Sequence, residues 1–219
     1  AREKMLELLQ ESNDLKQRQE ITQTVKCAER SGEPIEILVT NQWFIKILDK
    51  KKELLEKSAQ ANWYPKYMKI RMDQWIEGLS WDWCISRQRF FGVPFPIWYV
   101  KEANNKNAQT QIIIASAQEL PIDPLFALPS GYKKIKDLGE GQWLCSKDGL
   151  EYEITAEKDI MDTWATSSIS PQISSKAITK DLATDHARHE KLFPADLRPQ
   201  AHEIIRTWAF YTLCKAHLH

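Results

Sequence analysis

The stretch from Gly78 to Val100, GLSWDWCISRQRFFGVPFPIWYV, limits the fold more than any other part of the sequence. Proline fixes the backbone φ angle and has no amide hydrogen to donate. Pro94 and Pro96, at alternate positions, therefore exclude a helix and favour an extended or edge-like path. Three tryptophans in the same stretch indicate flat, rigid packing surfaces.

Regular patterns on both sides of this stretch are typical of α/β proteins. Apolar residues at helical spacing predict helices at about residues 1–12, 43–59 and 201–217, and another after Pro65. Apolar runs predict strands at about residues 35–40, 111–115 and 193–197. Because the last strand, a polar turn and the last helix follow one another, we predict an α/β fold built on an open sheet.

The middle of the chain contains many turn signals. Proline and glycine divide residues 120–157 into short pieces, and Ser116 with Glu119 has capping-box spacing just before them. We therefore predict a small β-rich excursion from the main layer at about residues 101–157. The sequence assigns no function to it.

Composition bounds the class of protein. Thirty basic residues balance thirty acidic ones, so net charge neither supports nor excludes a nucleic-acid partner. The four cysteines form no CxxC pair, which favours reduced thiols in a cytoplasmic protein. The sequence has no run of about 18 apolar residues and no signal-peptide pattern, so we expect neither a membrane span nor export.

Residue spacing leaves several chemical interpretations open. The chain has seven glycines and no glycine-rich phosphate loop, so any nucleotide must be held differently. The histidines, including His186 and His189, lack partners at metal-ligand spacing, so we predict no metal site. Cys84 is interpreted as a buried thiol rather than a nucleophile. Arg87 and Arg89 suit a structural role and an anion-binding role equally well.

Four long motifs resemble the class I aminoacyl-tRNA synthetases. WDWCISRQRFFGVPFPIWY is similar to the stretch that follows the editing insertion in the valyl, isoleucyl and leucyl enzymes. Three other segments point to the valyl type: CAERSGEPIEILVTNQWFIKI, DIMDTWATSS and RPQAHEIIRTWAFYTLCKAHLH. The chain starts at Ala1 without methionine and stops within a helical pattern, so we expect an internal fragment.

The resemblance implies a fold and a set of partners. It implies the second half of a Rossmann-like catalytic domain at residues 41–219, preceded at residues 1–40 by the closing segment of the editing insertion. It implies valine, ATP with Mg²⁺ and valine tRNA as partners of an intact, monomeric, cytoplasmic enzyme. The HIGH-like and KMSKS-like motifs are absent from these residues, so we expect no catalytic residue here and no activity from the fragment alone.

The resemblance also assigns site residues. By motif, Trp164, Ile204 and Trp208 correspond to the amino-acid pocket, although a tryptophan on a helix stripe is more often simply core. On the nucleotide side, Glu203 corresponds to a carboxylate facing the ribose, next to Ala201 and His202. Relatives with a zinc knuckle have CxxC pairs after the PIW motif. This chain has only Cys145 in that region, so we expect that zinc site to be lost.

Three alternatives remain open. An isoleucyl-type synthetase would carry a GxDQ-like motif before the last helix, where this chain has Pro199-Gln200-Ala201-His202-Glu203. A non-catalytic tRNA-binding or assembly module derived from a synthetase would keep the motifs without the activity. A structural domain without ligands would have Trp164 and Trp208 fully buried and far apart.

Overall fold

The computed structural model describes residues 2–29, 31–105, 107–178 and 183–218. The chain divides into two compact units, Ala1–Asn41 and Gln42–His219. Within the ranges just given, no helix is both long and apolar enough to cross a membrane.

The described residues of the first unit include one helix, α1 (Arg2–Glu11), none of whose residues is buried. Beyond it, Cys27 and Pro34 form an isolated antiparallel bridge around a turn. The strand predicted at residues 35–40 is wrong, because these residues form no strand, and Ile37 and Val39 are 98% and 103% exposed. An alternating apolar run becomes a stable strand only when it has pairing partners and a face to bury.

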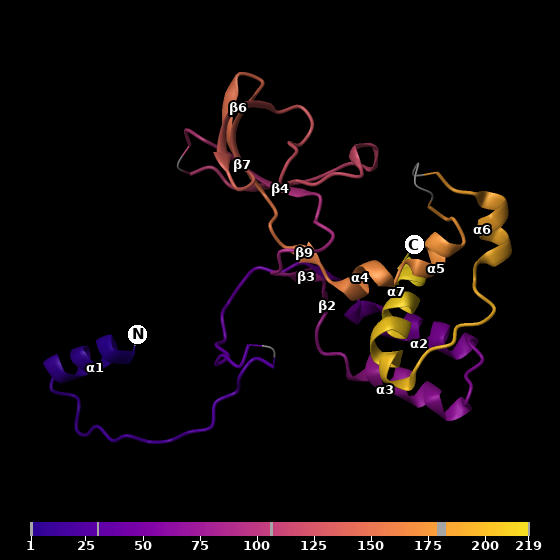
Figure 1. The fold of residues 1–219 in the computed structure, drawn as a ribbon, viewed down its shortest axis with the longest axis horizontal. Coiled ribbons are helices and arrows are strands. Elements are labelled where there is room, and N and C mark those ends of the chain that lie inside the picture. Colours follow the sequence, from indigo (N-terminus) through magenta and orange to yellow (C-terminus); the bar gives the residue numbers. More distant parts are fainter. Residues whose placement is uncertain (1, 30, 106, 179–182, 219) are drawn as a thin grey trace. The chain divides into compact units, whose positions relative to one another are not determined.

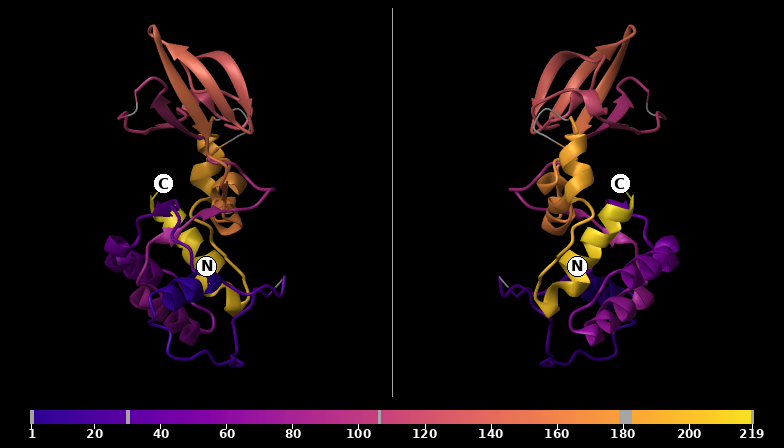
Figure 2. Two further views of the ribbon diagram at one scale, coloured as in Figure 1. Left: turned by 90° about the vertical axis from the view of Figure 1, so that its left-hand side faces the viewer. Right: turned by 90° about the vertical axis from the view of Figure 1, so that its right-hand side faces the viewer.

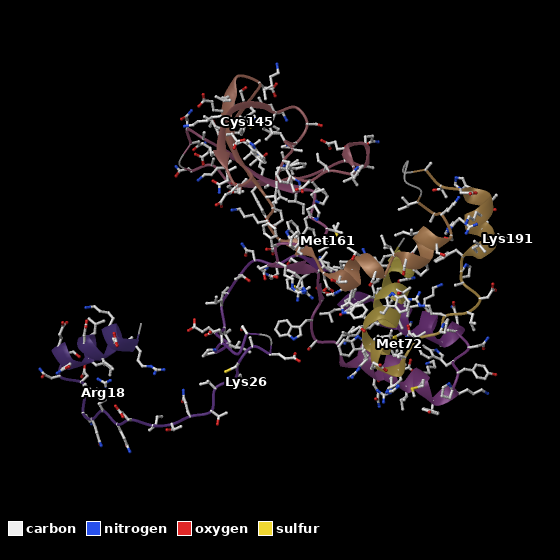
Figure 3. The ribbon with its side chains drawn as sticks, viewed as in Figure 1. Arg18, Lys26, Met72, Cys145, Met161 and Lys191 are labelled. Carbon is white, nitrogen blue, oxygen red and sulfur yellow. The ribbon has the colours of Figure 1, made fainter. Side chains whose placement is uncertain are left out.

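The second unit contains a helical cluster. It comprises η1 (Leu48–Lys50), α2 (Lys51–Gln60), η2 (Lys66–Met68), α3 (Lys69–Gly78) and α7 (Phe210–Leu218). Helix α2 contacts both α3 and α7, which lie beside it in Figure 1. Leu54, Met72, Ile76 and Phe210 are at most 2% exposed at the centre, and Met72 is labelled there in Figure 3. Burying each of these side chains stabilises the fold by about 1.5–3 kcal/mol.

The first of these helices starts later than its apolar pattern predicts. Residues 43–50 are not α-helical: β1 (Phe44–Ile45) pairs with β2 (Trp83–Cys84), and a short 3₁₀ turn follows. The Asp82 carboxylate accepts hydrogen bonds from the backbone N–H groups of Ile47 and Leu48 at 2.9 and 3.1 Å. These contacts, distant in sequence, outweigh the local helical pattern. The helix predicted after Pro65 is confirmed by α3.

A five-stranded antiparallel sheet forms the β-rich part. Its strand order is β5-β4-β8-β7-β6, and Figure 2 shows it curling upon itself. The strands are β4 (Ile97–Glu102), β5 (Gln111–Ile114), β6 (Lys133–Gly139), β7 (Gln142–Lys147) and β8 (Leu150–Ala156). Trp98, Val100, Trp143, Cys145 and Ile154 form its buried core. Between β5 and β6, η3 (Ala117–Glu119) is preceded by the predicted capping box of Ser116 and Glu119, which is confirmed.

The remaining elements lead to the last helix. Strand β3 (Ser86–Arg87) pairs with β9 (Ile160–Met161), followed by α4 (Thr163–Ser167), α5 (Ser170–Ser174) and α6 (His186–Leu192). The strand predicted at 193–197 is wrong: this segment has no strand partner, and Leu197 is 81% exposed. Every strand ladder of the described residues is antiparallel.

The helix predicted at 201–217 is confirmed from Phe210 onward, but its first half is not α-helical. The chain first forms η4 (His202–Ile204), then the π-helix η5 (Ile205–Ala209), and only then α7. The 3₁₀ and π segments are only 3 and 5 residues long, about one turn each, so the apolar stripe does not distinguish them from the start of a regular α-helix.

Candidate functional site

Two segments that the resemblance assigned to the amino-acid pocket meet in the structure. Trp164 lies on α4, and Trp208 lies in η5; α4 contacts both η5 and α7, next to which it lies in Figure 1. The Trp208 Nε1–H donates a hydrogen bond to the carbonyl oxygen of Ser167 at 3.3 Å. Ser167 ends the helix that carries Trp164. The indole of Trp208 is therefore attached directly to the Trp164 helix.

The local sequence explains where α4 begins. Strand β9 ends at Met161, and Asp162 then takes φ −54° and ψ 136°, a non-helical cap conformation. The Asp162 carbonyl oxygen accepts hydrogen bonds from the N–H groups of Ala165 and Thr166 at 2.9 and 3.2 Å. Trp164 consequently lies in the first turn of the helix, directly after the strand.

A π-helix carries Trp208. Residues Ile205–Ala209 form this element between a 3₁₀ turn and an α-helix, and Ile204 is the residue just before it. Short π-turns within helices are rare and often occur at functional sites, because they displace side chains from the regular helical lattice. The irregular backbone therefore coincides with two of the three expected pocket residues.

The burial of these side chains is intermediate. Trp164, Ile204 and Trp208 are all half-buried, and Trp164 packs at the edge of the core cluster that contains Ile205 and Phe210. A structural domain without ligands would have the two tryptophans fully buried and far apart. The structure instead places them, partly accessible, on elements in contact.

The residues expected on the nucleotide side lie at the start of η4. Ala201, His202 and Glu203 are exposed. The His202 Nδ1 lies 3.6 Å from the Glu203 carboxylate, with more than 60% of each side chain exposed. Glu203 is accessible to a ligand, and its contact with a ribose stays a prediction.

Arg87 makes contacts that a structural role requires, and its anion-binding role stays a prediction. Its Nη1 donates to the carbonyl oxygens of Cys84 and Ser86 at 3.1 and 2.7 Å, and its Nη2 lies 3.3 Å from Asp162 Oδ1. Asp162 is only 8% exposed, so this cation offsets a buried negative charge where α4 begins. Arg89 is exposed. Cys84 is half-buried, less than the sequence predicted, and its Sγ lies 3.6 Å from Gln42 Oε1.

An aromatic groove is lined by residues of α3, of the segment that includes β2, and of the start of α7. Its volume is about 440 Å³, and its lining includes Trp75, Trp81, Trp83, Arg87 and Tyr211. The rings of Trp83 and Tyr211 stack with centroids 3.9 Å apart. None of the six residues assigned to the amino-acid and nucleotide sites lines this groove.

Within the described ranges, no group of three or more His, Cys, Asp or Glu side chains is arranged to hold a metal ion. Cys145 lies in the core of the sheet, as Figure 3 shows, and burial raises the pKa of its thiol.

One residue of this region was missed by the sequence analysis. Arg198 precedes η4 and places its guanidinium carbon 3.8 Å from the centroid of the Trp208 ring. No spacing rule links an arginine in a loop to a tryptophan in the following helix. Only the RPQ segment within the matched motif could have drawn attention to it.

Comparison with known proteins supplies the family. The family described as tRNA synthetases class I (I, L, M and V) matches residues 6–218. The chain is 54% identical over 219 residues to the valine–tRNA ligases of Rickettsia typhi and Rickettsia prowazekii, and 52% identical to that of Rickettsia felis. All of this chain is covered in each comparison, but only 24%, 24% and 23% of the respective relatives.

The chain thus spans about a quarter of the length of these curated relatives. The family match extends from α1 to the last helix and includes both tryptophan segments. The chain therefore belongs to the class I tRNA synthetases of the I, L, M and V group.

Proposed function

We propose that this chain is part of a valine–tRNA ligase, an enzyme that activates valine with ATP and transfers it to valine tRNA. One observation carries the proposal: the Trp164 helix meets the Trp208 π-turn in a chain that matches valine–tRNA ligases along all 219 residues. The relatives bear that name, and the I, L, M and V group includes the isoleucyl alternative. Because the matched relatives are valine–tRNA ligases, we favour the valyl over the isoleucyl assignment.

The proposed reaction has two steps. In the first, the carboxylate of valine attacks the α-phosphorus of ATP, forming valyl-adenylate and releasing pyrophosphate. In the second, a terminal hydroxyl of the tRNA attacks the valyl carbonyl and AMP leaves. Both steps need mainly alignment of the reactants and stabilisation of phosphate charge. ATP is used with Mg²⁺, and the phosphate-binding motifs of the family are not found in these residues.

In this proposal the chain supplies the amino-acid pocket. Trp164 and Trp208 enclose the branched side chain of valine, and Ile204 completes the apolar wall. Rigid indoles exclude larger side chains sterically. They reject the isosteric threonine only about a hundredfold, a known value for valine–tRNA ligases. Glu203 faces the ribose of the adenylate, next to Ala201 and His202.

We propose a corresponding domain organisation for the parent enzyme. Residues 1–40 are the closing segment of an editing insertion, and residues 41–219 belong to a Rossmann-like catalytic domain with the β-rich excursion at about 101–157. The division of the chain into compact units after Asn41 supports this assignment. We further propose a monomeric, cytoplasmic parent enzyme that binds no zinc through this segment.

The test is valine-dependent exchange of pyrophosphate into ATP by the full-length protein. We expect exchange with valine and little with isoleucine. Trp208→Ala should lower kcat/KM for valine, whereas Trp81→Ala, which removes a 78% exposed indole outside the pocket, should leave exchange unchanged. Exchange that depends on isoleucine would replace the valyl assignment by the isoleucyl one. Binding of tRNA without any exchange would favour a non-catalytic module.

A further inference from the structure

We propose that Arg198 is a positioning residue that holds the indole of Trp208 in the orientation required for amino-acid selection. This inference rests on the proposed function, because it concerns the specificity of the same pocket. It adds a residue that does not itself touch the substrate.

The first observation is the stacking geometry. The guanidinium carbon of Arg198 lies 3.8 Å from the centroid of the Trp208 ring, the distance of a close contact over the ring face. Tryptophan is the best aromatic partner for a cation, and the attraction is stronger when both groups are partly removed from water. Both residues are half-buried. One face of the indole is therefore covered by the guanidinium, which leaves the opposite face for a ligand.

The second observation is how Arg198 itself is held. Its Nη2 donates a hydrogen bond to Thr212 Oγ1 at 2.8 Å. Thr212 lies on α7, one helical turn after Trp208, so the guanidinium bridges two positions on the same side of the helix. A planar, rigid guanidinium can stack and donate in its plane at once, which the ammonium group of lysine cannot do.

The third observation is the lack of a counter-ion. In the part of the chain that the structure describes, no carboxylate lies within ion-pair distance of Arg198. Its Nε is buried and has no hydrogen-bond acceptor among those residues, and burial lowers the pKa of Arg198. A desolvated cation without a carboxylate stabilises a fold less than an apolar residue of similar size would. We therefore assign the role of Arg198 to the contact between its planar guanidinium and the Trp208 ring.

The fourth observation is the opposite restraint on the ring. The Trp208 Nε1–H donates to the Ser167 carbonyl oxygen, so the indole is held at its edge by α4 and on its face by Arg198. Without the stacked guanidinium, one of these two restraints on the χ1 and χ2 angles of Trp208 is lost, and the ring can change its orientation. Such rotation would widen the space between Trp208 and the Trp164 helix, and a larger side chain would then fit.

The experiment uses the full-length protein and three variants. Arg198→Lys keeps the charge but loses the planar stack, and Thr212→Val removes the acceptor while keeping the shape of the side chain. Arg206→Lys is the matched control: its guanidinium lies 5.9 Å from the ring of Trp75, on another side of the helix, and its side chain is exposed. For each, kcat and KM are measured for valine, isoleucine and ATP by pyrophosphate exchange, together with the thermal midpoint.

We expect Arg198→Lys to raise KM for valine and lower the valine-to-isoleucine ratio of kcat/KM by about tenfold, equivalent to about 1.4 kcal/mol. Thr212→Val should change KM for valine and the valine-to-isoleucine ratio in the same directions but by less. KM for ATP should stay constant in both Arg198→Lys and Thr212→Val. Arg206→Lys should match the wild type.

An unchanged valine-to-isoleucine ratio of kcat/KM in Arg198→Lys would overturn the inference. So would a lower thermal midpoint and a lower kcat with an unchanged KM for valine, because that combination indicates a purely structural residue. If the wild-type protein fails to activate valine, the proposed function fails instead, and the two failures remain distinct.

Discussion

Gly92 allows the chain to pass close to Ile160 of β9, and adding one methyl group at position 92 should lower the free energy of unfolding. A Cβ at position 92 would lie 2.1 Å from Ile160 Cδ1 and 3.0 Å from both Cβ and Cγ1 of the same side chain. Ile160 is 8% exposed and is held in β9 by its pairing with Arg87 and Pro94. Because Ile160 is buried and its backbone is paired with both residues, its side chain cannot move away easily. Gly92→Ala should therefore destabilise the protein.

The size of the effect follows from the nature of the clash. Overpacking a fitted core costs about 1–3 kcal/mol. Ile160→Val removes Cδ1, the atom in closest contact, and alone should cost about 0.5–1.5 kcal/mol. The double variant relieves the worst contact, so its loss should be about 1 kcal/mol smaller than the sum of the two single losses.

Urea denaturation of the wild type, Gly92→Ala, Ile160→Val and the double variant measures how far the two losses depart from additivity. Gly78→Ala serves as the control, because a Cβ there meets nothing within 4 Å and Gly78 ends α3. Its free energy of unfolding should stay the same or rise by up to about 1 kcal/mol, since alanine favours a helix. Strictly additive losses for Gly92→Ala and Ile160→Val would refute the packing argument.

Three further predictions concern the sheet, the thiols and the pocket. The hydroxyl of Ser130 and the capping box lower the pKa of Glu119 to about 2, so the stability it contributes should be present above pH 4.5 and lost as the pH falls toward 2. Acid titration of Glu119→Gln against wild type checks this, and an equal acid sensitivity would contradict it. Exposed Cys27 should react with a thiol reagent in the native protein, whereas Cys145, whose pKa burial raises, should react only after unfolding; equal native rates would contradict this. Trp164→Ala should reduce kcat/KM for valine by roughly 10- to 100-fold with little change in KM for ATP, as measured by pyrophosphate exchange, because it removes one wall of the proposed pocket; an equal loss for both substrates would contradict the assignment.

Local sequence patterns predicted those elements whose stabilising contacts are also local. Pro65 directly precedes the 3₁₀ turn that leads into α3, and the capping box joins Ser116 to Glu119, three residues further on. The patterns failed where distant residues decide the structure. Residues 43–50 have a helical pattern, but pairing with β2 and the Asp82 carboxylate hold them in other conformations.

The candidate site could be predicted from the sequence only in part. Trp164 and Trp208 could be proposed from the motifs, whereas their connection through Ser167 depends on how two segments meet in space. Helical periodicity could not reveal the π-turn, since the apolar stripe continues through it. The contact between Arg198 and Trp208 depends on the path of an irregular loop, to which no periodicity applies.

The most direct measurement of the central claim is a crystal structure of the full-length protein with a non-hydrolysable valyl-adenylate analogue. We predict that the isopropyl group lies within about 4 Å of both the Trp164 and the Trp208 rings, the distance of apolar contact. An analogue bound with its isopropyl group away from both rings would contradict it.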